Sequence, residues 1–150
     1  EQYLIEALQV LLHKENFIEK VVIDKKTFAI TLYRKNNQEM LKDELSEGEK
    51  QMFATAILWA LAKTSGRPLP FMIDTPLARL DIEHRSNLVE TFFPSASHQV
   101  VIFSTDAEID EKYYAQLKPF ISKSYLMKYS SDSGSSKVED GFFWEQKVVN

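Results

Sequence analysis

The chain has 150 residues, of which 44% are hydrophobic and 27% are charged, and its formal net charge is −4. This length accommodates one domain with a hydrophobic core, and the composition is typical of soluble globular proteins. The negative charge excludes a chain that binds nucleic acid through an overall basic surface. The absence of cysteine excludes disulfides and thiolate metal sites, and it fits a reducing cytosol.

No segment has the pattern of a membrane span or a signal peptide. The longest apolar run, residues 54–62, is interrupted by Thr55 and is too short to cross a bilayer. Because the chain starts at Glu1 rather than at a methionine, we expect it to be a piece of a longer protein.

Apolar residues at helical spacing predict four helices. They span residues 1–15, 47–64, 82–93 and 107–118. The second helix ends at Gly66 and Pro68, residues that typically follow a helix C-terminus. Nearly every side of this helix carries apolar residues, so we expect it to be buried on most faces.

Alternating or continuous apolar residues predict six strands. They span residues 18–24, 27–34, 69–74, 98–103, 124–129 and 142–148. The first two strands form a predicted β-hairpin, residues 36–43 a loop, and residues 130–136 a polar turn. Strands that alternate with helices in the middle of the chain predict parallel strands, whose C-terminal ends carry ligands.

Residues Ser46 to Glu49 begin the predicted helix 47–64. Ser46 suits the N-cap, and Glu49, three residues later, completes a capping box in which each side chain binds a backbone N–H. Gly48 lies within this box and would let a foreign group approach the helix N-terminus, where N–H groups and the helix dipole favour an anion. These residues alone leave two interpretations open, a well-capped core helix and an anion site.

The order of the motifs resembles the C-terminal lobe of an ABC-type ATPase of the SMC-like branch. Residues 45–49 look like the signature motif, residues 71–74 like Walker B, residues 80–81 like the end of the D-loop, and residues 103–106 like the switch segment. A narrower similarity is to the DndD ATPase of bacterial DNA phosphorothioation systems. It is carried by residues 65–70, 73–81, 84–90, 97–100, 104–110 and 124–125.

This resemblance implies an α/β fold with a mainly parallel sheet, flanking helices and additional β-hairpins. It implies one domain, in which residues 1–15 end a coiled-coil helix, residues 16–43 form a β-hairpin and loop, and residues 44–150 form the half-domain with signature and Walker B motifs. It also implies a cytoplasmic, bacterial protein that uses ATP and Mg²⁺.

The resemblance assigns nucleotide binding in trans to the signature residues, which would contact the γ-phosphate of ATP held by an opposite subunit. These residues are Leu45, Ser46, Glu47, Gly48 and Glu49. Leu80 and Asp81 of the D-loop would lie at the dimer contact, and Asp74 would help to hold Mg²⁺, through a water. A purely structural alternative is that Asp74 and Asp81 are N-caps, a role that Asp81 can combine with the first.

Three positions depart from the usual pattern. Thr75 stands where most ABC ATPases have glutamate, and Thr105 stands at the switch position, which is usually histidine. Since threonine is no base at neutral pH, we expect slow hydrolysis, or hydrolysis that depends on Asp74, Asp106 or a partner. Asp74, Thr75, Thr105 and Asp106 are therefore the predicted catalytic residues. Glu47 replaces the first glycine of the usual signature and adds negative charge near the phosphate site.

The chain contains no Gly-x-x-x-x-Gly-Lys-[Ser/Thr] phosphate loop. The resemblance places that loop on an N-terminal lobe, so we expect this chain alone to be inactive. The implied partners are that lobe, a second ATPase head, other proteins of the phosphorothioation complex and DNA. Two alternatives remain open: an SMC-like head for DNA break repair, and a non-catalytic lobe that senses nucleotide and dimerises.

Overall fold

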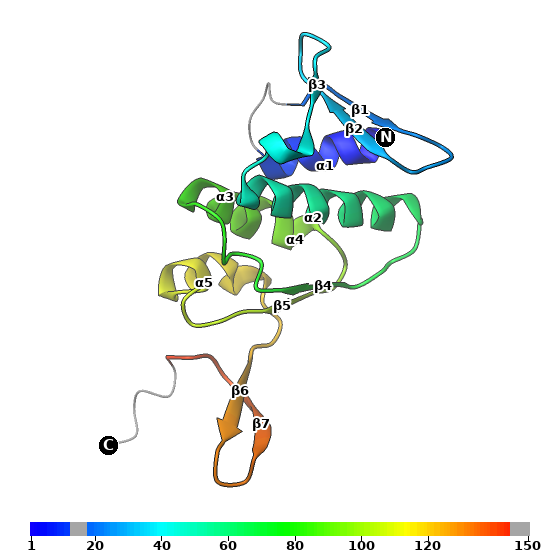
Figure 1. Cartoon of the computed structure of the whole chain (residues 1–150). Coiled ribbons are helices and arrows are strands. Elements are labelled where there is room, and N and C mark those ends of the chain that lie inside the picture. Colours follow the sequence, from blue (N-terminus) through cyan, green and yellow to red (C-terminus); the bar gives the residue numbers. More distant parts are fainter. Residues whose placement is uncertain (13–17, 145–150) are drawn as a thin grey trace.

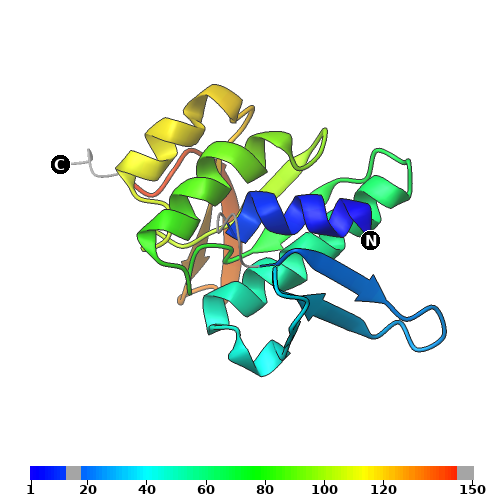
Figure 2. The ribbon, with the colours of Figure 1, turned by 90° about the horizontal axis from the view of Figure 1, so that it is seen from above.

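The structure, a computed structural model, describes residues 1–12 and 18–144. Figure 1 shows its layers, with strands β1 to β3 at one end beside helix α1, followed by α2, then α3 and α4, then the β4–β5 pair with α5. The β6–β7 hairpin extends from the far end. Seen from above, α1 crosses the middle of the molecule and the β1–β2 pair lies to one side of it (Figure 2).

Helix α1 (Gln2–Leu12) confirms the first predicted helix as far as the structure describes it. Its buried side chains recur at helical spacing and face α2 and the core. They are Leu4, Ala7, Leu8, Leu11 and Leu12. The last residues of the prediction, 13–15, lie outside the described residues.

A small antiparallel sheet follows, in the order β1 (Lys20–Ile23), β2 (Ile30–Tyr33) and β3 (Glu39–Met40). The first two strands confirm the predicted hairpin, although Asp24 closes a longer loop by accepting N–H bonds from Lys26 and Thr27 at 2.8 and 2.7 Å. The loop predicted for residues 36–43 was wrong in part. Met40 pairs with Leu32 in the sheet and is 2% exposed, so burial holds this short strand in place.

Helix α2 (Glu47–Thr64) has the predicted bounds. Its buried apolar side chains are Met52, Phe53, Ala56, Trp59 and Ala60. The expectation of burial on most faces was wrong for one side, where Leu58 and Leu61 are 58% and 61% exposed. One side of α2 therefore has no cover from the described chain.

Strands β4 (Phe71–Asp74) and β5 (Val100–Phe103) pair in parallel, as predicted. Phe71 is buried and meets the ring of Phe92 edge-on, with ring centroids 5.7 Å apart. The helical segment between the strands covers that face of the sheet. Parallel pairing is confined to these two strands among the described residues, whereas the other two sheets are antiparallel.

The crossover consists of α3 (Ile82–Asn87), a π-helical turn (Leu88–Phe92) and α4 (Phe93–Ser95). It confirms the predicted helix 82–93. Helix α4 includes Pro94. Proline has no N–H to donate and is tolerated near the beginning of a helical segment.

The C-terminal part contains α5 (Glu111–Leu117), a 3₁₀ turn (Lys118–Phe120) and the hairpin of β6 (Tyr125–Ser130) and β7 (Ser135–Asp140). Helix α5 starts later than predicted because Asp110 is its N-cap. The strand predicted at residues 142–148 was wrong for 142–144, and 145–148 lie outside the described residues. The polar residues Ser135 to Asp140 form the second strand instead. No helix among the described residues is long and apolar enough to span a membrane.

Candidate nucleotide site

The N-terminus of α2 has the predicted capping box. The Ser46 hydroxyl accepts the Glu49 N–H at 3.2 Å, and the Glu49 carboxylate accepts the Ser46 N–H at 2.8 Å. Leu45 and Glu49 are buried, at 3% and 7% exposure, whereas Ser46 and Glu47 face solvent. The box thus fixes the first helical turn and leaves the Ser46 side chain accessible.

Glu47, the unusual residue of the predicted signature motif, forms a salt bridge with Lys50. Its carboxylate lies 2.8 Å from the Lys50 ammonium, which lowers the pKa of Glu47 below its usual value. Lys50 therefore offsets the negative charge that Glu47 brings to the helix N-terminus.

Gly48 brings α2 against the segment that follows β4. A Cβ atom at this position would lie 3.2 Å from the Arg79 carbonyl oxygen and 3.2 Å from Leu80 Cδ2. One turn later, the Gln51 side chain donates to the Pro76 carbonyl at 2.8 Å. The glycine thus serves a close backbone approach, in which the signature helix and the predicted D-loop are in direct contact.

Asp74 and Thr75 end β4 at its C-terminal edge, and both are exposed. Thr75 has a φ of 45°, and its N–H donates to the Phe103 carbonyl on β5 at 2.8 Å. A β-branched residue in the left-handed region is strained, and such strain occurs preferentially at functional sites. This bond holds Thr75 beside the start of the predicted switch segment.

Thr105 and Asp106 follow β5 and are exposed. The Glu108 side chain, only 4% exposed, accepts the Thr105 N–H at 3.2 Å and the Thr105 hydroxyl at 3.3 Å. Its other oxygen accepts the Leu77 N–H at 2.9 Å. Glu108 therefore ties the loop after β5 to the loop after β4.

Asp81 is the N-cap of α3, which confirms the structural role predicted as an alternative for this residue. Its carboxylate accepts the His84 N–H at 2.9 Å and lies 2.8 Å from His84 Nδ1. These two contacts with His84 lower the pKa of Asp81. Leu80 is buried, and its carbonyl accepts a bond from Arg85 Nε at 2.9 Å. The end of the predicted D-loop is thus fixed to the first turns of α3.

The donor set fits the predicted Mg²⁺. No cluster of three or more His, Asp or Glu side chains occurs in the described part of the chain. Mg²⁺ in nucleotide sites is held by one or two carboxylates together with waters and substrate phosphates. A single exposed carboxylate, Asp74, at a strand end is compatible with this mode.

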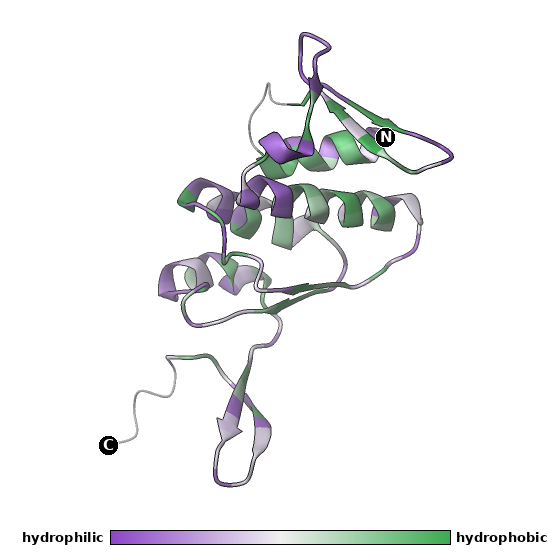
Figure 3. Cartoon of the chain, in the orientation of Figure 1, coloured by the Kyte–Doolittle hydropathy of each residue, from purple (hydrophilic) through white to green (hydrophobic). Residues whose placement is uncertain are grey.

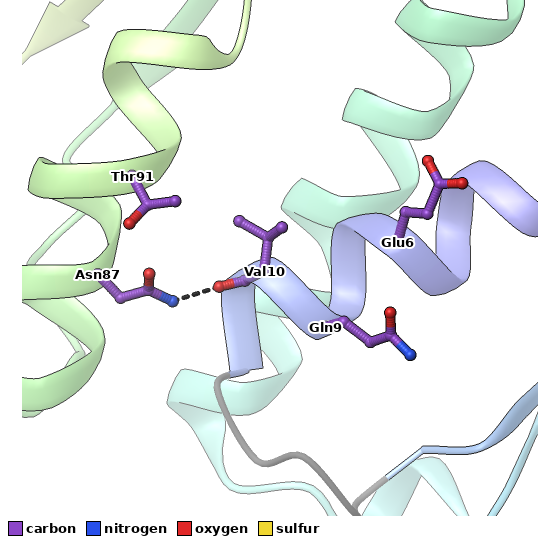
Figure 4. Close-up of a pocket in the computed structure, with 5 residues that line it drawn as sticks. All are labelled: Glu6, Gln9, Val10, Asn87 and Thr91. Atoms are coloured by element: carbon purple, nitrogen blue, oxygen red, sulfur yellow. Dashed lines mark hydrogen bonds between the residues drawn. The ribbon is translucent and has the colours of Figure 1, made fainter.

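An open pocket of about 380 Å³ lies away from these residues, between α1 and the crossover helices (Figure 4). It is lined by Glu6, Gln9, Val10, Asn87 and Thr91. The Asn87 amide donates to the Val10 carbonyl and, at 3.2 Å, to the Leu11 carbonyl at the C-terminal end of α1. None of the predicted site residues lines this pocket.

The structure brings the N-terminus of α2, the predicted D-loop and the two strand ends into one contact network. The sequence reasoning missed the residues that connect them, Gln51, Arg85 and Glu108. Glu108 had a detectable signal, because Thr105 and Glu108 have the same Ser/Thr-x-x-Glu spacing as the capping box at Ser46. Gln51 and Arg85 bind the backbone carbonyls of Pro76 and Leu80, and these contacts match no local sequence pattern.

Solved structures share the fold of the chain. A chain described with ATP-driven dimerization and DNA-stimulated activation of SMC ATPases superposes with a TM-score of 0.61 at 16% identity, over 94% of this chain and 84% of that one. An Smc head bound to the C-winged helix domain of ScpA gives 0.67 at 15% identity, over 99% and 44%. The SMC head domain from Thermotoga maritima gives 0.55 at 14%, over 95% and 47%.

The chain has the fold of part of an SMC head domain. It spans less than half of the length of the latter two SMC heads. No sequence-family model matches it, and no curated protein matches it in sequence. The likeness to SMC heads is therefore one of fold.

Proposed function

We propose that the chain is the C-terminal lobe of an SMC-like ATPase head that engages ATP held by a second head. The observation that carries this proposal is the contact between the signature helix and the D-loop at Gly48, together with the SMC-head fold. In this proposal the N-terminus of α2 presents N–H groups and the Ser46 hydroxyl to the terminal phosphate of the ATP. The D-loop, fixed by Gln51 and Arg85, faces the same dimer interface.

The residues at the strand ends act on the ATP bound by the chain's own head. Asp74 would hold Mg²⁺, which would supply positive charge to neutralise the phosphates. Thr75, Thr105 and Asp106 lie at the same edge of the sheet and complete the predicted catalytic group.

The open face of the β4–β5 pair supports an N-terminal lobe as the first partner. Residues that pair in register point to the same side, so Met72, Asp74, Val101 and Phe103 share one face. Met72 and Phe103 are 68% and 51% exposed, and the hydropathy colouring shows that both strands are mainly apolar (Figure 3). A lobe that carries the phosphate loop would cover this face and bring phosphates to Asp74.

The decisive experiment is the Asp74→Asn substitution in the complete protein, consisting of this lobe and the lobe with the phosphate loop. We expect at least about 100-fold slower ATP turnover, because the carboxylate no longer supports Mg²⁺. Asp43→Asn, an exposed residue outside the site, is the matched control. Unchanged turnover in Asp74→Asn would instead indicate a non-catalytic lobe that senses nucleotide and dimerises.

We further propose that the ATPase acts in the bacterial cytoplasm and supports DNA phosphorothioation together with DNA and the other proteins of that system. The similarity to DndD supports this role, and it is carried by residues 65–70, 73–81, 84–90, 97–100, 104–110 and 124–125. Disrupting the gene should then remove phosphorothioates from genomic DNA, measured by mass spectrometry of nuclease digests. Unchanged phosphorothioates, combined with ATP turnover that DNA ends stimulate, would favour a break-repair head.

A further inference from the structure

Two hydroxyl groups of the proposed site have opposite hydrogen-bond polarity. The Ser46 hydroxyl accepts a bond from the Glu49 N–H, so its own proton is available to donate. The Thr105 hydroxyl instead donates its proton to the Glu108 carboxylate. Ser46 can therefore donate to a phosphate oxygen, whereas Thr105 presents only lone pairs to the site.

Charge reinforces this difference. In the described chain the Glu108 carboxylate accepts hydrogen bonds from neutral donors, the N–H groups of Leu77 and Thr105 and the Thr105 hydroxyl. The carboxylate is 4% exposed, so solvent screens it weakly. A phosphate oxygen placed on Thr105 would meet this negative charge at short range. A water molecule is neutral, and it can donate a proton to a lone pair of the Thr105 oxygen.

We propose that Thr105 binds the attacking water rather than the phosphate, and that Glu108 is the positioning residue that sets this polarity. The inference rests on the proposed ATPase function. The water oxygen bonds to the terminal phosphorus, and the bond from that phosphorus to the bridging oxygen breaks, its electron pair leaving with ADP. The water proton passes to Thr105 Oγ as the Thr105 proton passes to Glu108. The pair thus supplies the proton acceptor that Thr75 cannot provide.

The geometry of the loops supports this role. The Thr75 N–H donates to the Phe103 carbonyl, and the Leu77 N–H donates to the Glu108 carboxylate. These two hydrogen bonds hold the segment after Asp74 against the end of β5 and the loop that contains Thr105. Thr105 is exposed at the edge of the sheet where Asp74 ends β4. Thr105 is therefore accessible at this edge of the sheet, while the Glu108 carboxylate that it contacts is buried.

The test uses Thr105→Val, Glu108→Gln and the double variant in the complete protein. Turnover and the dissociation constant for ATP are measured separately. We expect each single variant to lower kcat about 100-fold with the ATP dissociation constant unchanged within about threefold, because general-base assistance contributes about this much. The double variant should lose no more than either single variant, since the two residues act as a unit.

Controls separate a chemical role from a structural one. Thr105→Ser keeps the hydroxyl and should retain kcat within about threefold, and Glu111→Gln, an exposed residue of α5, should behave like the wild type. Weaker ATP binding with unchanged kcat in Thr105→Val would overturn the inference and make Thr105 a phosphate ligand. Multiplicative losses in the double variant would also overturn it. If Asp74→Asn leaves turnover intact, the proposed ATPase function fails instead.

Discussion

At the scale of single residues, Thr75 shows what the sequence can and cannot reveal. Its identity as a departure from the usual glutamate is visible in the sequence, but its left-handed backbone is not, because threonine disfavours that conformation. The conformation is imposed by contacts on both sides, the N–H bond to Phe103 and the tie from Leu77 to Glu108. Ser46, in contrast, was predictable with its partner because a capping box is local.

Replacing Thr75 by glycine should stabilise the 150-residue chain. Glycine adopts a positive φ without the steric cost that a β-branched residue bears, so relief of this strain should raise the free energy of unfolding by about 1 kcal/mol. The greater conformational entropy of glycine in the unfolded chain offsets part of this gain. Urea unfolding measures the difference.

Asn37→Gly is the matched control for this substitution, because Asn37 also has a positive φ, of 57°, but asparagine tolerates that region well. Its effect should be a few tenths of a kcal/mol at most. A Thr75→Gly variant no more stable than this control would show that the strain at Thr75 is relieved by its neighbours.

At the scale of elements, helices and parallel strands were predicted better than turns and hairpin ends. Helix α2 has both expected ends because its capping box and its glycine stop are local signals. Strand β7 was missed because Ser135 to Asp140 is exposed throughout and contains one apolar residue, Val138, so it has no hydrophobic pattern. Its pairing comes from β6, a contact that only the folded chain shows.

The N-cap of α3 gives a pH-dependent contribution to stability. Because contacts with His84 hold the pKa of Asp81 below its ordinary value of 3.8, this contribution is complete above that pH. It is lost as the pH falls through the lower folded-state pKa. The Asp81→Asn substitution keeps a hydrogen-bond acceptor at the N-cap but removes the titrating carboxyl group. The free energy of unfolding of this variant should therefore match that of the wild type at neutral pH and fall less in acid.

Urea unfolding of both proteins at pH ~7 and ~3 measures this difference. Since the Asp81 side chain is 65% exposed, solvent screening keeps the effect small, and the comparison should be made at low salt. Parallel loss of stability in the two proteins on acidification would show that Asp81 makes no pH-dependent contribution.

At the scale of the whole molecule, the described chain leaves apolar surface on several elements. Leu58 and Leu61 on α2, Met72 on β4 and Phe103 on β5 are each more than half exposed. The β6–β7 hairpin carries Tyr125, Met127, Tyr129 and Val138, which the strand register places on one face. The sequence predicted these residues as apolar but could not show which stay uncovered, because burial depends on contacts between distant elements. Because exposed apolar patches mark interaction sites, we expect another lobe to cover this surface.

The open sheet face therefore makes a final prediction about assembly. Met72→Ser should change the free energy of unfolding of this chain little, since Met72 is already 68% exposed. It should weaken association with a separately produced N-terminal lobe by about 1–2 kcal/mol, the transfer free energy of the methionine surface that becomes buried. Leu88→Ala is the contrasting variant, because Leu88 is 1% exposed and its truncation should destabilise the chain itself by about 2–5 kcal/mol. Urea unfolding and titration calorimetry separate the two effects, and unchanged affinity in Met72→Ser would place the N-terminal lobe on another face.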